Sequence, residues 1–236
     1  MTTTFSVTAS DVINASLRTL GVLGATDTAN SNDQINCLQA LNIIVKDWGK
    51  DAQYLWKQKE ILLPMVVGQA SYQIGLTATG TGALVTDRPL RILDAFIRDS
   101  SNNDQTIQIV SKQEYNTLGD KTSQGVPNQI FYDAQLTNGV LYVYNVPSDT
   151  THTIHLIAQI PINDLATVND TFDITQEAYR AIKWVLADEL ALEYGASPTT
   201  IQITAQKALM YKQKLDDWSQ EEVSTFFQPT PRFGRQ

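Results

Sequence analysis

The chain has 236 residues, and its 17 Lys and Arg against 25 Asp and Glu give a formal net charge of −8. Hydrophobic residues make up 42% of the sequence, enough for a core that needs no disulfide or metal. The acidic balance, without clustered Lys and Arg, argues against a dedicated nucleic-acid-binding protein, because neutralising phosphates requires such clusters. The single cysteine, Cys37, excludes a disulfide framework, a cysteine zinc site and an iron–sulfur cluster.

The start of the sequence does not have the pattern of a signal peptide, because its first positive side chain is Arg18. The longest strongly apolar stretch, Ile61–Val67, is interrupted by Pro64 and is far shorter than the ~20 residues of a membrane span. We therefore expect a protein made in a reducing cytoplasm, with no membrane partner.

Two helices are predicted in the first quarter of the chain. Thr8–Asp11 has the pattern of a capping box and precedes apolar residues at helical spacing, which end at Gly21. A second box, Ser31–Gln34, precedes another apolar face that extends to Trp48. The two helices form a hairpin whose apolar faces need further partners.

From about Lys57 the pattern changes to short strands separated by turns. The predicted strands are 60–67, 70–74, 90–98, 106–111, 129–132, 140–146 and 153–160, and 112–118 is predicted as a single helical turn. Gly68-Gln69 is interpreted as a hairpin turn between the first two strands. Short strands at this spacing predict a small antiparallel sandwich or barrel.

Helical periodicity returns after this β region. Asp173 or Thr175 is predicted to cap a helix that ends at Gly195, and Ser197-Pro198 starts a last long helix. The final residues, Phe226–Gln236, contain two prolines and two arginines and no acidic residue, which predicts an extended basic arm.

The sequence therefore predicts an α+β fold in which two helical hairpins form a four-helix bundle and a β module is inserted between them. The expected divisions are 1–56 for the N-terminal hairpin, 57–165 for the β domain, 166–225 for the C-terminal hairpin and 226–236 for the arm.

No catalytic, metal or cofactor site is predicted. His152 and His155 are three residues apart in a predicted strand, where they face opposite sides. Cys37 is interpreted as a small buried side chain, and the glycine-rich Gly75–Gly82 as a loop that lacks the ending of a phosphate loop. The helical carboxylates, such as Glu189 and Glu193, are interpreted as a solvated face.

Seven strings in series resemble the head-to-tail adaptor family of tailed bacteriophages, also called packaged-DNA stabilisation or tail accessory proteins. The strings cover most of the chain in the family's order: Ser10–Gly21; Gln39–Asn42 through Trp48; Gly68–Tyr72 with Ile74-Gly75; Arg88–Ile92 with Ala95-Phe96; Gln124–Pro127 before Tyr132-Asp133; Leu141–Tyr144 before Pro147; and Trp184–Gly195.

The resemblance implies a structural virion protein and not an enzyme, present in the host cytoplasm during assembly and then in the head–tail connector. It implies a ring, expected to be dodecameric, that sits beneath the portal, extends the DNA channel, helps retain packaged DNA and gives the tail or nozzle protein a docking surface. Packaged DNA is expected to pass through without sequence-specific binding.

The resemblance also implies that the C-terminal arm docks on the portal. Its predicted docking residues are three phenylalanines, two prolines and two arginines: Phe226, Phe227, Pro229, Pro231, Arg232, Phe233 and Arg235. Two alternatives remain open at this point. One is a tail-completion or stopper protein of the same connector, and the other is a wall-degrading hydrolase that uses Glu189 or Glu193.

Overall fold

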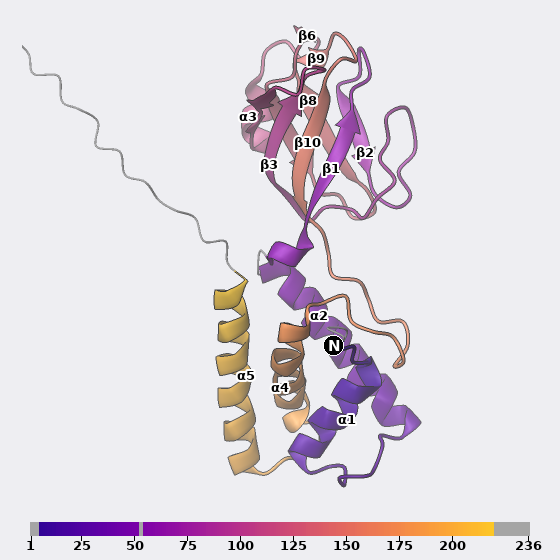
Figure 1. Cartoon of the computed structure of the whole chain (residues 1–236), viewed down its shortest axis with the longest axis vertical. Helices are drawn as coiled ribbons and strands as arrows, with labels where there is room; N and C mark the ends of the chain where they lie inside the picture. Colours follow the sequence, from indigo (N-terminus) through magenta and orange to yellow (C-terminus); the bar gives the residue numbers. More distant parts are fainter. Residues whose placement is uncertain (1–4, 52–53, 220–236) are drawn as a thin grey trace, which may run out of the picture.

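The computed structural model describes residues 5–51 and 54–219, which form a helical part and a β part (Figure 1). The chain enters the helical part first, crosses to the β part and then returns, so both ends of the described chain belong to the helical part. The predicted α+β class is confirmed. None of the described helices is both long and apolar enough to cross a membrane.

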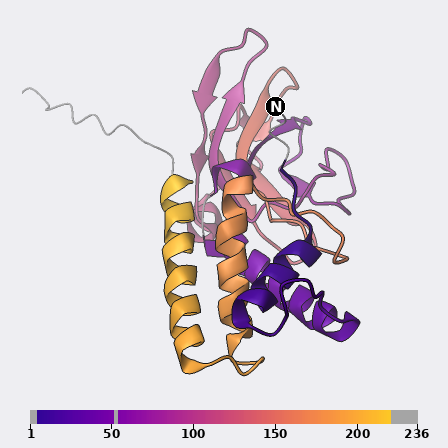
Figure 2. The ribbon, with the colours of Figure 1, turned by 60° about the horizontal axis from the view of Figure 1, so that its bottom comes forward.

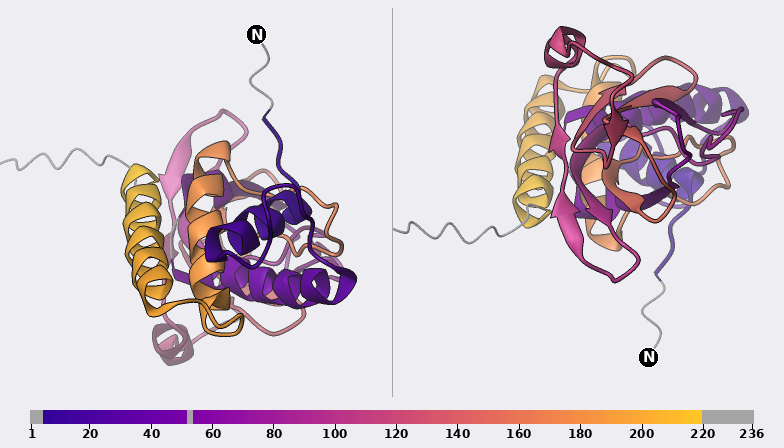
Figure 3. Two further views of the ribbon diagram at one scale, coloured as in Figure 1. Left: turned by 90° about the horizontal axis from the view of Figure 1, so that it is seen from below. Right: turned by 90° about the horizontal axis from the view of Figure 1, so that it is seen from above.

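The helical part is built around one central helix. Its long helices are α1 (Ala9–Leu20), α2 (Ser31–Asp51), α4 (Tyr179–Ala191) and α5 (Pro198–Trp218). Helices α1, α2 and α5 all pack on α4. Figures 2 and 3 show α5 on one side of α4, with α1 and α2 on the other.

A single apolar core holds these helices together. Its large members from α1, α2 and α4 include Ile13, Leu17, Leu41, Trp48, Ile182, Leu186 and Leu190. Small side chains allow α1 to approach α4 closely, and the buried Ser16 hydroxyl donates a hydrogen bond to the Lys183 carbonyl of α4 at 2.9 Å. From α5, this core contains the buried Leu215 and the partly buried Ile201 and Tyr211, so most of the α5 surface is left outside it.

The helix starts show how far local sequence determines these elements. The Thr8 box caps α1 as predicted, with Thr8 and Asp11 satisfying each other's backbone N–H groups. Ser197 caps α5 and Pro198 begins it, also as predicted. The prediction for α2 was wrong by one residue. Asn30 accepts from the Asp33 backbone N–H at 3.0 Å and donates to the Asp33 carboxylate at 2.7 Å, so Ser31 is already the first helical residue.

The β part consists of two four-stranded sheets that pack face to face. The first sheet has the order β1 (Gln58–Pro64), β10 (Thr153–Gln159), β3 (Arg91–Arg98) and β4 (Asp104–Thr106). The second has the order β2 (Ser71–Ile74), β8 (Gly139–Tyr144), β7 (Gln129–Asp133) and β5 (Gln108–Ile109). Their inner faces share one core that includes Leu63, Tyr72, Ile97, Ile130, Leu141 and Leu156.

This arrangement has the layers of a sandwich, and the predicted alternative of a barrel is wrong, because the described strands do not close on themselves. The prediction of a purely antiparallel β region is also wrong. Strand β5 pairs with β7 in parallel, and so do the short strands β6 (Gln124–Gly125) and β9 (Val146–Pro147). The single helical turn predicted between β5 and β6 is confirmed as α3 (Lys112–Thr117).

Gly68-Gln69 is not the hairpin turn predicted from the sequence. Strand β1 pairs with β10 and strand β2 with β8, so the segment between β1 and β2 carries the chain from one sheet to the other. Pro64 has no backbone N–H to donate, and it ends β1 at the edge of its sheet, where a missing donor is tolerated.

The connection from β10 to α4 is bonded to α2 and joins the two parts. The Asn42 side chain donates to the Leu165 carbonyl at 3.0 Å and accepts from the Leu165 N–H at 2.9 Å. The Gln159 side chain donates to the Gly49 carbonyl at 3.0 Å. These bonds help to hold the β part against α2, because they attach the first part of the connection to that helix at two points.

We predict that Asn42→Ala lowers the free energy of unfolding by about 2 kcal/mol, because it removes both bonds to Leu165 and leaves two backbone groups without partners. Urea unfolding measures this change. Asn36→Ala is the matched control, since Asn36 is an exposed side chain on the same helix. Equal stability of the two variants would contradict the role assigned to Asn42.

Candidate functional site

The two histidines, His152 and His155, have separate partners in the structure. His155 lies in β10, with Nδ1 2.5 Å from the Glu60 carboxylate and its ring stacked on Phe96. His152 precedes the strand, with Nδ1 3.1 Å from the Asp149 carboxylate. Across residues 5–51 and 54–219, no group of three or more His, Cys, Asp or Glu side chains is placed to hold a metal ion.

Cys37 is fully buried in α2, which confirms its interpretation as a small buried side chain. Its Sγ lies 3.7 Å from the Tyr194 hydroxyl oxygen. Burial raises the pKa of the Cys37 thiol, and the Tyr194 contact offsets only part of this effect. The thiol is therefore protonated near neutral pH and shielded from reagents.

We predict that a thiol reagent at pH 8 modifies Cys37 at least about a hundredfold more slowly in the native protein than in urea, since reaction needs local opening. Absorbance of the released reagent measures the rate. A native rate equal to the unfolded one would show that the packing around Cys37 is open.

The carboxylates that the hydrolase alternative would use do not share an enclosed environment. Glu189 and Glu193 are exposed on and just after α4. Asp188 is half-buried, and burial raises the pKa of its carboxyl group, with a hydrogen bond from Thr204 acting in the opposite direction. The glycine-rich segment between β2 and β3 lies in a loop, as predicted.

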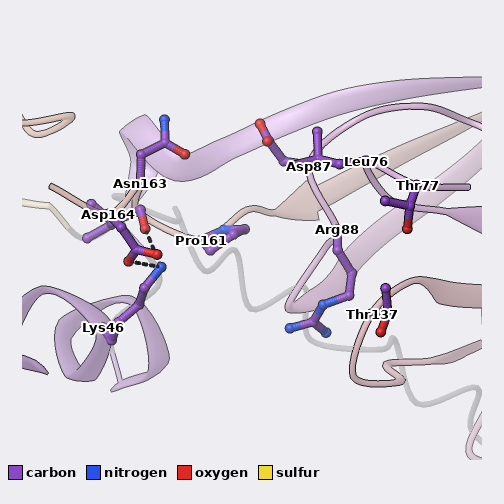
Figure 4. Close-up of a pocket in the computed structure, with 10 residues that line it drawn as sticks. Lys46, Leu76, Thr77, Asp87, Arg88, Thr137, Pro161, Asn163 and Asp164 are labelled. Atoms are coloured by element: carbon purple, nitrogen blue, oxygen red, sulfur yellow. Dashed lines mark hydrogen bonds and ion pairs between the residues drawn. The ribbon is translucent and has the colours of Figure 1, made fainter. Parts of the chain in front are cut away.

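A cleft lies where the β part meets the helical part. It has a volume of about 370 Å³, and Figure 4 shows Lys46, Pro161 and Asp164 on its helical side and Asp87 and Arg88 on its β side. Lys46 Nζ lies 2.6 Å from the Asp164 carboxylate and donates to the Ile162 carbonyl at 3.0 Å. The charged groups on the helical side are therefore used to hold the connection from β10, which gives this cleft a structural explanation.

The outer face of the first half of α5, residues 202–210, is exposed, carries no charge and has a mixed apolar and polar character. Ile203, Leu209 and Met210 are exposed on it, and Leu209 keeps 72% of its surface accessible. Gln202 and Gln206 are exposed beside them, so apolar and hydrogen-bonding groups alternate without a charge. A helix that packs mainly on α4 and leaves an outer face of this composition exposed has the character of a protein interface.

A second exposed stripe lies on α2, on the other side of the helical part (Figure 3). Ile35, Gln39 and Ile43 follow one another at four-residue steps, and Ile43 keeps 68% of its surface accessible. Helices α2 and α5 lie on opposite sides of α4, and two different exposed faces are what a head-to-tail contact needs, because one face of a subunit then meets the other face of its neighbour.

The sequence did not reveal a group of positive side chains that the fold brings together. Arg180 and Lys183 on α4 meet Lys207 and Lys214 on α5, around the stacked rings of Trp184 and Tyr211, and we call these four the cationic cluster. Arg180 and Lys183 are three residues apart and Lys207 and Lys214 are seven apart, so the sequence alone indicates that each pair shares one face of its helix. That the two faces meet follows only from the packing of α5 on α4.

The comparison with known families decides the assignment. A family model described as SU10 adaptor protein matches residues 7–230, which is nearly the whole chain. The chain belongs to the SU10 adaptor protein family. The resemblance to phage head-to-tail adaptors is thus confirmed, and with it a structural role in a phage rather than membership of an enzyme family. No curated protein matches the chain.

The match to the SU10 adaptor family includes α1, α5 and every element between them, so α2 and α5 both lie within the matched region. The predicted docking arm, Phe226–Gln236, lies outside the described residues, and its role stays a prediction. The described part of this SU10 adaptor ends at Ser219, directly after α5.

Proposed function

We propose that this adaptor forms a ring beneath the phage portal, extends the DNA channel, retains the packaged genome and gives a tail or nozzle protein its docking surface. Membership of the adaptor family supports the structural role. The observation that supports the ring is the pair of exposed faces on α2 and α5, two helices that lie on opposite sides of α4.

A ring with portal-matching symmetry, which we propose to be dodecameric, needs heterologous contacts that close on themselves. In this proposal the outer face of α5 in one copy packs against Ile35, Gln39 and Ile43 of α2 in the next copy. Apolar side chains from both faces would fill the centre of the contact, and the exposed glutamines would form hydrogen bonds around them. The four long helices then act as one bundle, the wall of the ring, and we keep the division at 1–56, 57–165 and 166–225 as part of the proposal.

The portal contact is assigned to the arm. Phe226, Phe227 and Phe233 supply rings for apolar pockets, Pro229 and Pro231 limit the conformations that must be ordered on binding, and Arg232 and Arg235 can pair with carboxylates. The β part, at the other end of the molecule from most of the helical part (Figure 1), presents its loops to the next tail protein.

The net charge of −8 supports passage of DNA without binding, because an acidic wall repels a phosphate backbone and keeps it free to slide. The same adaptor family is compatible with a stopper role, in which the chain would bind a tail protein and not the portal.

A binding assay of the full chain against the purified portal and against the purified tail proteins separates these two roles. The proposal expects binding to the portal with the tail proteins absent. Binding to tail proteins alone, with none to the portal, would replace the adaptor ring with the stopper.

A further inference from the structure

Two adjacent hollows on the surface of α4 share two lining residues, Arg180 of α4 and Tyr211 of α5. The first, about 330 Å³, extends from Trp218 to Arg180 and Tyr211. The second, about 530 Å³, lies between α4, α1 and the residues before α1, and it reaches Trp184 on α4 and Lys207 on α5. Together they form one groove, which we call the α4–α5 groove, and it begins where the described chain ends.

This groove contains the cationic cluster, and the charges of that cluster are not balanced by ion pairs. The Arg180 guanidinium lies 5.0 Å from the centre of the Tyr211 ring, and Lys183 and Lys207 lie 5.1 and 5.2 Å from the centre of the Trp184 ring. Among the described residues, none of the four cations has a carboxylate within ion-pair distance. Lys212 on the same helix differs, because its Nζ lies 2.9 Å from Asp216.

The acidic side chains that line the groove leave this charge in place. Asp11 uses one carboxylate oxygen to accept from the Thr8 N–H and hydroxyl, which cap α1. Glu177 lines the first hollow together with Arg180. One nearby carboxylate does not neutralise four cations. Burial, together with Arg18 and Arg180, lowers the pKa of Lys183, as expected for an ammonium group among other cations.

The chain that follows Ser219 has the complementary chemistry. Its next residues are Gln220, Glu221, Glu222, Val223, Ser224 and Thr225, with two adjacent carboxylates and one small apolar side chain. The groove spans α5 from Trp218 back to Lys207, roughly 16 Å at 1.5 Å per residue. Six extended residues reach roughly 20 Å, so this segment is long enough to turn at Ser219 and lie along the groove of its own chain.

We propose that the acidic segment Gln220–Thr225 binds the α4–α5 groove of its own chain, with Glu221 and Glu222 against Arg180, Lys183 and Lys214. Bound there, it neutralises the cationic cluster and fixes where the arm that begins at Phe226 leaves the helical part. This rests on the proposed function only for the arm's purpose, because the contact itself belongs to the free subunit.

Amide hydrogen exchange of the full-length protein, followed by mass spectrometry, tests the contact. We expect exchange of the 220–225 amides to be slowed roughly tenfold at low salt relative to a free peptide, and this protection to be lost in Glu221→Gln/Glu222→Gln. Asp217→Asn is the control, since Asp217 is an exposed acid on α5, and it should keep the protection. Free-peptide exchange in the unmodified protein would overturn the proposal.

A charge-exchange variant separates the groove contact from a simple extension of α5. Glu221→Lys/Glu222→Lys should lose the protection, and adding Lys183→Glu/Lys214→Glu should restore it. If the 220–225 amides stay protected in all these variants, the segment extends α5 as a helix and the groove contact is overturned. Protection that appears only at concentrations where light scattering detects dimers would assign the segment to a second copy and overturn binding within one chain.

Portal binding is measured on the same variants, so that failure of the groove contact can be distinguished from failure of the proposed adaptor function. Loss of protection in Glu221→Gln/Glu222→Gln with portal binding retained supports both the groove contact and the proposed function. If the 220–225 amides are protected but the protein does not bind the portal, the groove contact is supported and the proposed portal-binding role of the arm is contradicted.

Discussion

Deleting Phe226–Gln236 should leave a folded monomer whose affinity for the portal falls by at least about a hundredfold. The arm carries three phenylalanines and two arginines, the residue types that dominate binding energy at protein interfaces. The main apolar cores of the helical and β parts consist of residues that precede the arm, so its removal should not change the thermal unfolding midpoint. Surface plasmon resonance against immobilised portal measures the affinity.

Two full-length variants identify which part of the arm binds. Replacing Phe226, Phe227 and Phe233 with Ser removes the rings, and replacing Arg232 and Arg235 with Gln removes the charges while the arm keeps its length. We expect the larger loss from the phenylalanine variant, because ring burial outweighs exposed ion pairs. Portal binding that is unchanged by the full deletion would contradict the role of the arm.

Leu209→Glu on α5 should prevent ring formation without unfolding the subunit. Leu209 is 72% exposed in the monomer, so a charge there is solvated. In the proposed contact it is covered by α2 of the next copy, where an unpaired carboxylate costs several kcal/mol for each interface, by the usual penalty for burying a charge. The loss is repeated at every contact around the ring.

Leu136→Glu is the matched control for this variant. Leu136 lies in the turn between β7 and β8 and is 95% exposed, so it offers the same chemical change outside the proposed contact. Negative-stain images of complexes with the portal should show rings for Leu136→Glu and none for Leu209→Glu. Rings formed equally well by both variants would remove α5 from the subunit contact.

The sequence predicted the elements better than it predicted their partners. The capping box at Thr8 and the Ser197-Pro198 start are determined by residues within one turn, and both are confirmed. Ser31 was wrong as the cap of α2 because Asn30, immediately before it, makes the same kind of reciprocal bond with Asp33.

Strand pairing depended on contacts far apart along the chain. The first two strands are neighbours in sequence, yet β1 pairs with β10, about 90 residues away. The pattern of apolar residues indicates which side of a strand is buried, and it does not indicate in which of two packed sheets the strand lies. For the same reason the parallel pairing of β5 with β7 could not be predicted.

The candidate surfaces divide in the same way. The composition of the arm could be read directly from the sequence. The same is true of the low fraction of charged residues, 18%, which suits subunit contacts. The cationic cluster could not, because Arg180 and Lys207 come together only when α5 folds back on α4. The cationic cluster is a local concentration of positive charge in a chain with a net charge of −8, and one end of it lies near Ser219, which precedes the acidic segment Gln220–Thr225.

Light scattering of the full-length protein, first alone and then mixed with its portal, tests the central claim most directly. We expect a ring on the portal, with a rise in mass that corresponds to one adaptor for each portal subunit. A chain that stays monomeric and leaves the mass of the portal unchanged would contradict it.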